Sequence, residues 1–261
     1  MKRTLIQPRL DDFPDTYHAL LQRGSVWDSS CSPEARVWYL EADGGCFLKS
    51  APVGTLANEA KMAGFFAAKG LGAAVLDFRC ENGRDWLLTS RVVGEDCTHY
   101  LHDPRRLCDL IATRLRALHE LCFTDCPIQN RTATFLQSAE QGYRIGRCDL
   151  DFYAFPQKPF ASADGAYRFL QENKHLLACD TLLHGDYCLP NILLDDWRFS
   201  GFIDLGNGGV GDRHIDLFWG AWTLAFNLKT EAYRERFFDA YGRDKIEMHR
   251  LSLVAAAEVF G

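Results

Sequence analysis

The sequence predicts an α+β protein of two lobes, a small strand-rich lobe followed by a larger and mainly helical one. Before residue 93, short apolar runs alternate with turn residues, whereas most of the later chain carries apolar residues at helical spacing. The dipeptide Val93-Gly94 interrupts the pattern between the two regions. We therefore place the lobes at residues 1–93 and 94–261. A chain of 261 residues is long enough to bury a substantial core.

The first lobe is expected to contain two β-hairpins and one helix. Residues 36–41 and 46–50 lie on either side of the turn signal Ala42-Asp43-Gly44-Gly45, and residues 74–80 and 86–92 form a second such pair. Between the hairpins, residues 55–69 have helical content. This segment stops at Gly70, which suits the end of a helix because glycine adopts positive φ without strain.

Helices dominate the second expected lobe. Asp103-Pro104 is an N-cap followed by proline at the first helical position, and leucine and isoleucine then recur at helical spacing. Further helices are expected at 132–145, 164–177, 212–228, 230–241 and 244–260. Short strands around 182–183, 192–194 and 199–203 interrupt them. The glycines of 208–211 follow no first strand, so they indicate a flexible loop rather than a dinucleotide-binding turn.

Composition narrows the classes of function. The net charge of −6 argues against a nucleic-acid or anionic-membrane surface and better suits a cationic partner. The ten cysteines lack C-x-x-C spacing, so free thiols are expected rather than zinc sites or disulfides. The N-terminus has no signal-peptide core, and the longest apolar stretch, 218–226, is about half of the ~18 residues that a membrane span needs. We expect a cytoplasmic protein that is a monomer or a weak dimer.

The strongest functional signal lies between residues 184 and 206. Asp186 and Asn191 stand in the pattern H-x-D-x4-N, and Asp204 follows the next apolar run in the pattern I-D-x-G. In phosphoryl transfer, one carboxylate orients the hydroxyl nucleophile, while an amide oxygen and a second carboxylate hold magnesium against the phosphates. Each residue alone would be an ordinary turn residue. The three together at these offsets favour a magnesium-dependent phosphoryl transferase.

A phosphoryl transferase must also hold its nucleotide, and the first lobe has candidate residues. Lys49 ends a strand pattern and can place its ammonium on the α and β phosphates, while Glu59 on the next helix can pair with that ammonium. For either residue alone, a surface lysine or a helical glutamate is the simpler interpretation. Residues 29–33, including Ser32, can cover the phosphates with backbone N–H groups, although this segment lacks repeated glycines.

At these residues the chain resembles the aminoglycoside 3′-phosphotransferases, bacterial kinases that inactivate aminoglycoside antibiotics. The closest local matches are His184-Gly185-Asp186-Tyr187-Cys188-Leu189-Pro190-Asn191 and Phe199-Ser200-Gly201-Phe202-Ile203-Asp204. Further similar segments are Gly83-Arg84-Asp85-Trp86-Leu87-Leu88, Leu118-His119-Glu120, Asp125-Cys126-Pro127 and Ser32-Pro33-Glu34-Ala35-Arg36-Val37. The similarity extends over nearly the whole chain.

The resemblance implies a protein-kinase-like fold that uses ATP, or alternatively GTP, with Mg²⁺. It makes Asp186 the catalytic carboxylate, Asn191 and Asp204 the magnesium ligands, and Lys49 with Glu59 the phosphate clamp. Residues 90–94, with Ser90 and Val92, become the hinge that receives the adenine. The implied reaction is phosphorylation of an aminoglycoside, at its 3′-hydroxyl, which would give antibiotic resistance.

An aminoglycoside carries several ammonium groups, so its site should contain carboxylates. The resemblance implies that such carboxylates come from a loop before the catalytic strand, from a helix of the second lobe and from the chain terminus. Asp149 and Asp151 lie in the first of these places and Glu258 in the third. Each can equally be a solvated carboxylate. The helix after Asp216, which we expect to brace the catalytic loop, departs from the family. It carries Trp222, Thr223, Phe226 and Asn227 where many relatives have acids. This favours weaker binding, a narrower acceptor range or a different acceptor, unless the aromatic residues pack in the core.

Two other functions stay open. A kinase of the same fold could act on another small hydroxylated metabolite or antibiotic, which the shortage of acids on that helix would suit. The alternative from a different class is a pseudokinase that binds nucleotide and serves as a scaffold. Retention of Lys49, Glu59, Asp186, Asn191 and Asp204 argues against it, since an inactive site has no chemical need of all five.

Overall fold

The computed structural model describes residues 3–31, 33, 35–150 and 160–261. The strands are β1 Thr4–Ile6, β2 Val26–Asp28, β3 Arg36–Leu40, β4 Cys46–Pro52, β5 Val75–Glu81, β6 Arg84–Ser90, β7 Glu95–Asp96, β8 Thr181–Leu183, β9 Ile192–Asp195, β10 Arg198–Phe202 and β11 Gly209–Gly211. The α-helices are α1 Asp15–Leu21, α2 Ala57–Ala68, α3 Pro104–His119, α4 Arg131–Arg144, α5 Ala163–Asn173, α6 His214–Leu228, α7 Arg234–Tyr241 and α8 Met248–Glu258.

The chain divides into two compact units. The first comprises Met1–Asp96 and Pro190–Gly206, and the second comprises Cys97–Leu189 and Asn207–Gly261. The first unit ends three residues beyond the boundary expected at residue 93, and it also takes in a segment that we had placed in the second lobe. The reason is pairing: β9 pairs with β7, and the backbone N–H of Phe202 donates to the carbonyl of Leu71 at 2.8 Å.

The first unit is built on a six-stranded sheet with the strand order β1-β2-β3-β4-β6-β5, and neighbouring strands are antiparallel. Both predicted hairpins are present, as β3–β4 and β5–β6. The predicted helix is α2, and Gly70 has the expected positive φ of 67°. Strands β1 and β2 and helix α1 were not predicted, so the expectation of a single helix in this region was wrong. These elements have only three, three and seven residues, too short for a clear periodic pattern.

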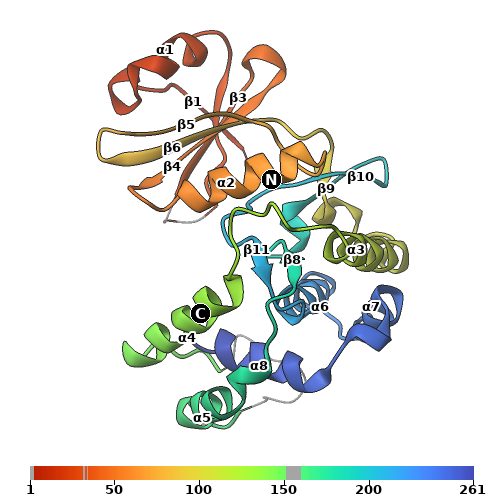
Figure 1. The fold of residues 1–261 in the computed structure, drawn as a ribbon. Helices are drawn as coiled ribbons and strands as arrows, with labels where there is room; N and C mark the ends of the chain where they lie inside the picture. The colour runs from red at the N-terminus through yellow and green to blue at the C-terminus, as the bar shows by residue number, and fades with distance from the viewer. Residues whose placement is uncertain (1–2, 32, 34, 151–159) are drawn as a thin grey trace. The chain divides into compact units, whose positions relative to one another are not determined.

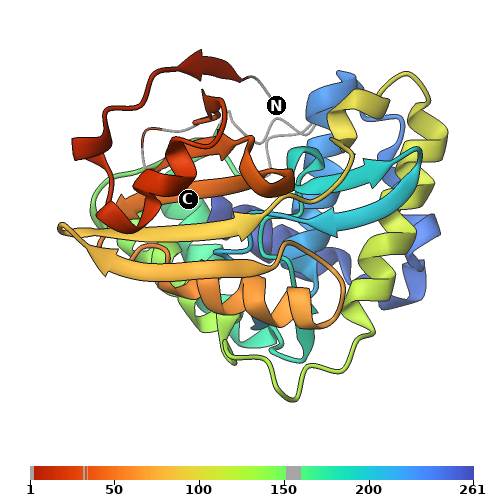
Figure 2. The same ribbon diagram turned by 90° about the horizontal axis from the view of Figure 1, so that it is seen from above.

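The two faces of this sheet are covered by different helices (Figures 1 and 2). On one face Phe13, Tyr17 and Leu21 pack against a cluster that includes Trp38 and Trp86. On the other face lies a smaller cluster of buried residues, Ala51, Leu56 and Leu87, against which Ala60 of α2 packs. Because side chains alternate along a strand, Lys49 points to the same face as Ala51, toward α2.

The second unit is mainly helical, as predicted. The carboxylate of Asp103 accepts a hydrogen bond from the backbone N–H of Arg106, which confirms the expected N-cap of α3. Helix α6 packs against α3, α7 and α8, and much of its surface is buried. The flexible loop expected at residues 208–211 was wrong, because Gly209–Gly211 forms β11 and pairs with β8. A β-carbon at Gly211 would lie 2.6 Å from a methyl of Leu183, so a larger residue there would require that side chain to shift.

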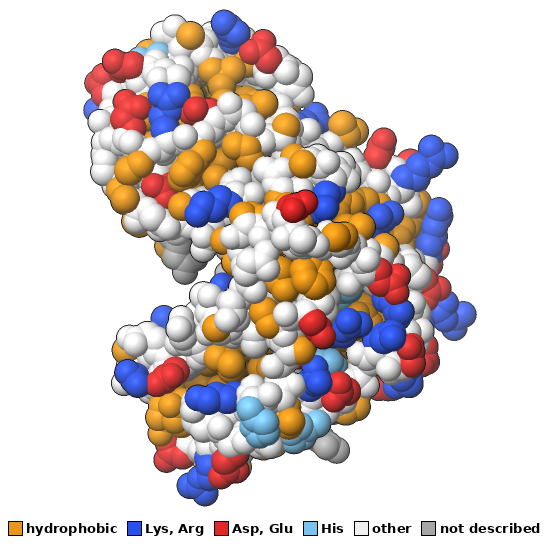
Figure 3. Space-filling view, in the orientation of Figure 1, with side chains coloured by type: hydrophobic (Ala, Val, Ile, Leu, Met, Phe, Trp, Pro, Cys, Tyr) orange, Lys and Arg blue, Asp and Glu red, His pale blue; other side chains and the backbone are white. Residues whose placement is uncertain are grey.

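Charged side chains of both signs are interspersed on the face drawn in Figure 3, where neither sign forms a broad continuous patch. Within the described residues, no helix combines the length and apolar character required to cross a bilayer. All ten cysteines are free thiols, and five of them are exposed: Cys31, Cys80, Cys122, Cys148 and Cys179.

Candidate active site

The hairpin formed by β9 and β10 brings two of the predicted metal ligands together. Asn191 directly precedes β9, and its carbonyl accepts a hydrogen bond from the backbone N–H of Ile203 at 3.0 Å. Asp204 directly follows Ile203, the residue whose backbone is bonded to Asn191. Its φ of 58° is uncommon for a residue with a side chain, although aspartate tolerates it better than most. An amide oxygen and a carboxylate, the donors that Mg²⁺ prefers, thus lie at adjoining positions.

Lys49 links this hairpin to helix α2 through two carboxylates. Its ammonium lies 2.7 Å from Oε2 of Glu59 and 3.0 Å from Oδ1 of Asp204. The ion pair predicted between Lys49 and Glu59 is therefore present. The contact with Asp204 was not predicted, because it joins residues 155 positions apart and depends on how β10 folds back onto the sheet.

The charges of this cluster shift one another's pKa values. Burial disfavours the ammonium, but the carboxylates of Asp204 and Glu59 outweigh burial and raise the pKa of Lys49 to about 12. Burial and the nearby charge of Asp204 raise the pKa of Glu59, although Lys49 opposes that change. Lys49 is thus fully protonated at neutral pH, and it holds a carboxylate on each side.

The predicted hinge residues lie in the same unit. The hydroxyl of Ser90 accepts a hydrogen bond from the backbone N–H of Ala74 at 2.9 Å, so this side chain stabilises the start of β5. Val92 packs close to Gly201 of β10, where a β-carbon would lie 2.9 Å from a methyl of the valine. Ser32 lies outside the described residues.

In the second unit, Asp216 braces the loop that carries Asp186, as predicted. The carboxylate of Asp216 is fully buried and accepts hydrogen bonds from the backbone N–H groups of His184 and Gly185, each at 2.7 Å. Gly185 has a φ of 86°, and a β-carbon there would collide with the carbonyl oxygen of Asn207. The N–H of Asp186 donates to Nδ1 of His184 at 3.3 Å. The position of Asp186 is therefore fixed by backbone contacts on its N-terminal side.

A second anchor holds the C-terminal side of the same loop. The backbone N–H of Leu189 donates to the hydroxyl of Thr223 at 3.1 Å, and both groups are buried. The side-chain amide of Asn227 donates to the carbonyl of Thr223 at 2.7 Å. Thr223 and Asn227, singled out as replacing acids, thus stabilise the loop and the helix.

His119 and Tyr241 form a buried pair behind Asp216 that the sequence pattern does not predict. Nε2 of His119 lies 3.2 Å from Oδ2 of Asp216, and Nδ1 lies 2.8 Å from the hydroxyl of Tyr241. Because Asp216 only accepts hydrogen bonds when ionised, the neutral ring carries its proton on Nε2 and accepts from Tyr241. Burial lowers the pKa of His119 despite Asp216, and burial raises the pKa of Tyr241 to about 12. The sequence marks His119 only within the segment Leu118-His119-Glu120, which resembles the family.

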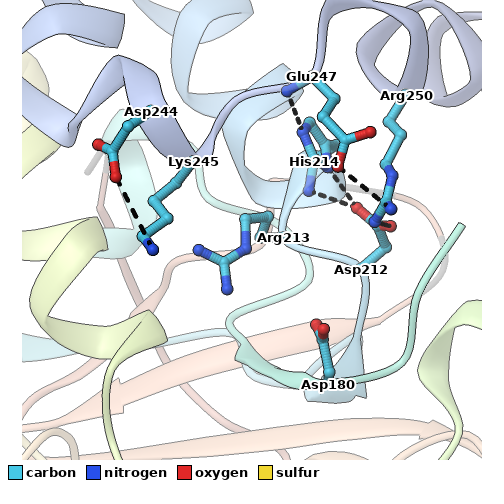
Figure 4. Close-up of a pocket in the computed structure, with 8 residues that line it drawn as sticks. All are labelled: Asp180, Asp212, Arg213, His214, Asp244, Lys245, Glu247 and Arg250. Atoms are coloured by element: carbon cyan, nitrogen blue, oxygen red, sulfur yellow. Dashed lines mark hydrogen bonds and ion pairs between the residues drawn. The ribbon is translucent and has the colours of Figure 1, made fainter.

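A polar pocket of about 230 Å³ in the second unit is lined by charged residues, among them Asp212, Arg213 and His214 (Figure 4). Several of its charges are mutually paired, as in the contacts of Arg250 with Asp212 and Glu247 and of Nδ1 of His214 with Asp212 at 2.6 Å. The guanidinium of Arg213 donates to the hydroxyl of Tyr241 at 3.5 Å, which connects this pocket to the brace behind Asp216.

The predicted acceptor carboxylates are only partly brought together. The backbone N–H of Asp149 donates to the carbonyl of Val259, so Asp149 lies next to the end of α8, where Glu258 is located. Oε1 of Glu258 accepts a hydrogen bond from the indole N–H of Trp219 at 2.8 Å. Asp151 lies outside the described residues.

Residues 33–254 match the model of the phosphotransferase enzyme family. The chain belongs to this family. A probable aminoglycoside 3′-phosphotransferase of Lactococcus lactis subsp. lactis (strain IL1403) is 47% identical to this phosphotransferase over 254 residues, which are 97% of this chain and 96% of the relative. The family predicted from residues 184–206 is therefore confirmed.

Solved structures of aminoglycoside phosphotransferases resemble this phosphotransferase in fold. The structure of APH(3″)-Id from Streptomyces rimosus matches 89% of this chain and 92% of its own, with a TM-score of 0.70 and 26% identity. The structure of the same protein with ADP and streptomycin matches 87% and 91%, with a TM-score of 0.68. The predicted α+β, protein-kinase-like fold is confirmed.

Proposed function

We propose that this phosphotransferase uses ATP and Mg²⁺ to phosphorylate a hydroxyl group of an aminoglycoside, at the 3′ position, and so confers antibiotic resistance. The observation that carries the proposal is the cluster of Lys49 between Glu59 and Asp204, with Asn191 beside it. Binding of a nucleoside triphosphate with Mg²⁺ requires such a set of groups: a lysine fixed by a buried glutamate, next to an aspartate and an asparagine.

The nucleotide side of the reaction rests on the first unit. Lys49 would bind the α and β phosphates, and Glu59 would keep its ammonium in place. The amide oxygen of Asn191 and the carboxylate of Asp204 suit Mg²⁺, which takes few protein ligands and completes its shell with phosphate oxygens and water. When bound, Mg²⁺ would neutralise charge on the phosphates. GTP is the alternative nucleotide.

The acceptor side rests on the loop of Asp186. Its carboxylate would accept a hydrogen bond from the acceptor hydroxyl and direct the oxygen at the γ-phosphorus. The new P–O bond forms as the bond to the ADP oxygen breaks, and the hydroxyl proton passes to Asp186 or to solvent. The transition state is loose, so positioning by Asp216 and Thr223 contributes more than the basicity of Asp186.

Two relatives support this choice of substrates. The Lactococcus lactis relative is named as a 3′-phosphotransferase, and the Streptomyces rimosus protein was solved with ADP and streptomycin. The first argues for the 3′-hydroxyl. The second argues for an adenine nucleotide and for an aminoglycoside as the acceptor class.

The test is release of ADP or GDP by the purified protein with Mg²⁺, either nucleotide, and kanamycin, neomycin or streptomycin. We expect turnover with at least one aminoglycoside, and loss of at least about 100-fold in kcat for Asp186→Ala. NMR of the product would identify the phosphorylated hydroxyl. Absence of turnover with a broad aminoglycoside panel and both nucleotides would refute the proposal.

A second acceptor class is favoured by one observation. Helix α6 presents Trp222 and Phe226 rather than acids, and Phe226 is 52% exposed. A less cationic hydroxylated compound would suit this face better than a polyamine. Turnover of such a compound with a kcat/KM above that of every aminoglycoside would favour this alternative.

A further inference from the structure

Three aromatic side chains form a continuous row along helix α6. The ring centroids of Trp219 and Trp222 lie 5.3 Å apart in an edge contact, and those of Trp222 and Phe226 lie 4.8 Å apart, stacked at 13°. Both tryptophans are half-buried and Phe226 is exposed. The row therefore runs from the interior of the second unit to its surface, and core packing does not account for its outer end.

The same face of α6 holds the loop of Asp186. Residues spaced by three or four positions share a helix face, which places Trp219 between Asp216 and Thr223. Asp216 binds the loop at His184 and Gly185, and Thr223 binds it at Leu189. The aromatic row thus begins on the helix face that supports the reacting carboxylate.

The inner end of the row is attached to a carboxylate. Trp219 donates its indole N–H to Oε1 of Glu258 at 2.8 Å, which restricts the position of that side chain. The half-buried guanidinium of Arg131 interacts electrostatically with the carboxylates of Glu258 and Asp216, and it donates to the side-chain oxygen of Asn207 at 2.7 Å. Part of the negative charge around Glu258 is therefore already balanced.

The outer end of the row carries a positive charge. The ammonium of Lys229 lies 4.2 Å from the centre of the Phe226 ring, in a cation–π contact. An acceptor with an ammonium group at this end would be repelled. The two ends of the row differ in charge, since a carboxylate lies at Trp219 and an ammonium at Phe226.

We propose that Trp219 is a positioning residue for acceptor recognition, which holds Glu258 so that it binds one ammonium group of the acceptor. This inference rests on the proposed function. Trp222 and Phe226 form an apolar wall along which the acceptor lays the C–H face of a sugar ring. A carboxylate that Trp219 already holds in place loses less side-chain entropy when the acceptor binds. It can therefore contribute more to affinity than a carboxylate that is free to move.

The test compares Trp219→Phe, Glu258→Gln and the double variant, with kanamycin as the acceptor. Trp219→Phe keeps an aromatic ring but removes the N–H donor. We expect its KM for kanamycin to rise about 10-fold, with kcat within about twofold of the wild type. The double variant should have the same KM as Glu258→Gln, because the two side chains act as one unit. Trp27→Phe, in β2 of the first unit, is the matched control and should leave KM unchanged.

Four outcomes would overturn the inference. An unchanged KM in Trp219→Phe, or additive effects of the two substitutions, would refute it while leaving the proposed function intact. A fall in kcat of Trp219→Phe by the same factor with every acceptor would show that Trp219 serves only the fold. Thermal unfolding of each variant would identify that case. If the wild type neither binds nor phosphorylates any aminoglycoside, the proposed function fails, and this inference fails with it.

Discussion

Lys49 is the cation that neutralises two neighbouring carboxylates of the predicted nucleotide site. Its ammonium separates the carboxylates of Glu59 and Asp204, and both would face each other uncompensated without it. Lys49→Met keeps the length of the side chain and removes its charge. We expect kcat/KM for the nucleotide to fall by about 100-fold or more, because a preorganised charge on the phosphates is lost. Steady-state kinetics with varied ATP would measure this.

The control for this substitution is Lys61→Met on the same helix as Glu59. Lys61 is exposed, and its substitution should leave the kinetics unchanged. A Lys49→Met protein with wild-type affinity and turnover would contradict the proposed phosphate clamp.

Gly185 is the residue whose lack of a side chain shapes the loop of Asp186. Gly185→Ala introduces both a strained φ and a collision with the carbonyl of Asn207. Gly146 offers a matched control, since it has a φ of 74° but open space around the position of a β-carbon. We expect Gly146→Ala to cost about 1–2 kcal/mol in free energy of unfolding, from strain alone, and to keep activity.

Gly185→Ala should cost clearly more than this control and should abolish turnover. Urea unfolding and kinetics of both variants would test the comparison. Equal costs would mean that the loop can shift away from Asn207 without penalty.

Elements with strong local signals could be predicted from the sequence. The β3–β4 and β5–β6 hairpins have turn residues between apolar runs, and α3 has its cap at Asp103, so local chemistry decided their positions. Strand β11 could not be predicted in this way. Its glycines favour no strand by themselves, and it exists because β8 offers a partner.

The site shows the same division between local and distant contacts. Asp186, Asn191 and Asp204 could be found because their spacing lies within one short segment. The brace of His119 and Tyr241, and the bond from Trp219 to Glu258, join residues on different helices. Their sequence signals are single residues without spacing, so only the fold reveals that they meet.

Helix α6 acts as the support of the catalytic loop through Thr223. Thr223→Val keeps the shape of the side chain and leaves the buried N–H of Leu189 without its acceptor. We expect a loss of about 2 kcal/mol in free energy of unfolding, together with a lower kcat, because a buried donor is left unsatisfied. Thr113→Val on α3, an exposed position, should change neither quantity. Equal stability of the two variants would show that the loop does not depend on this anchor.

At the scale of the whole molecule, the chain path divides one motif between two compact units. Asp186 belongs to the second unit, whereas Asn191 and Asp204 belong to the first, because Pro190–Gly206 pairs with β7 and with the segment at Leu71. No single cut therefore separates the units. Residues 1–93 alone would lack Asp204 and the hairpin that carries it, so the clamp of Lys49 requires a part of the chain more than 100 residues away.

The stability of the whole chain should depend on pH through His119. Burial lowers the pKa of this histidine in the folded protein, so the unfolded chain, with a pKa near about 6.5, takes up the proton first as the pH falls. Stability is thus expected to be complete above about pH 6.5 and to decrease below it until the folded-state pKa is reached. Urea unfolding between about pH 8 and pH 5 would measure this decrease in the wild type.

His119→Gln should be less stable at neutral pH, because it alters the contact with Asp216, but it should lose less stability on acidification. His175→Gln, at an exposed position, should keep the wild-type slope. Identical slopes in the wild type and His119→Gln would exclude His119 as the titrating group.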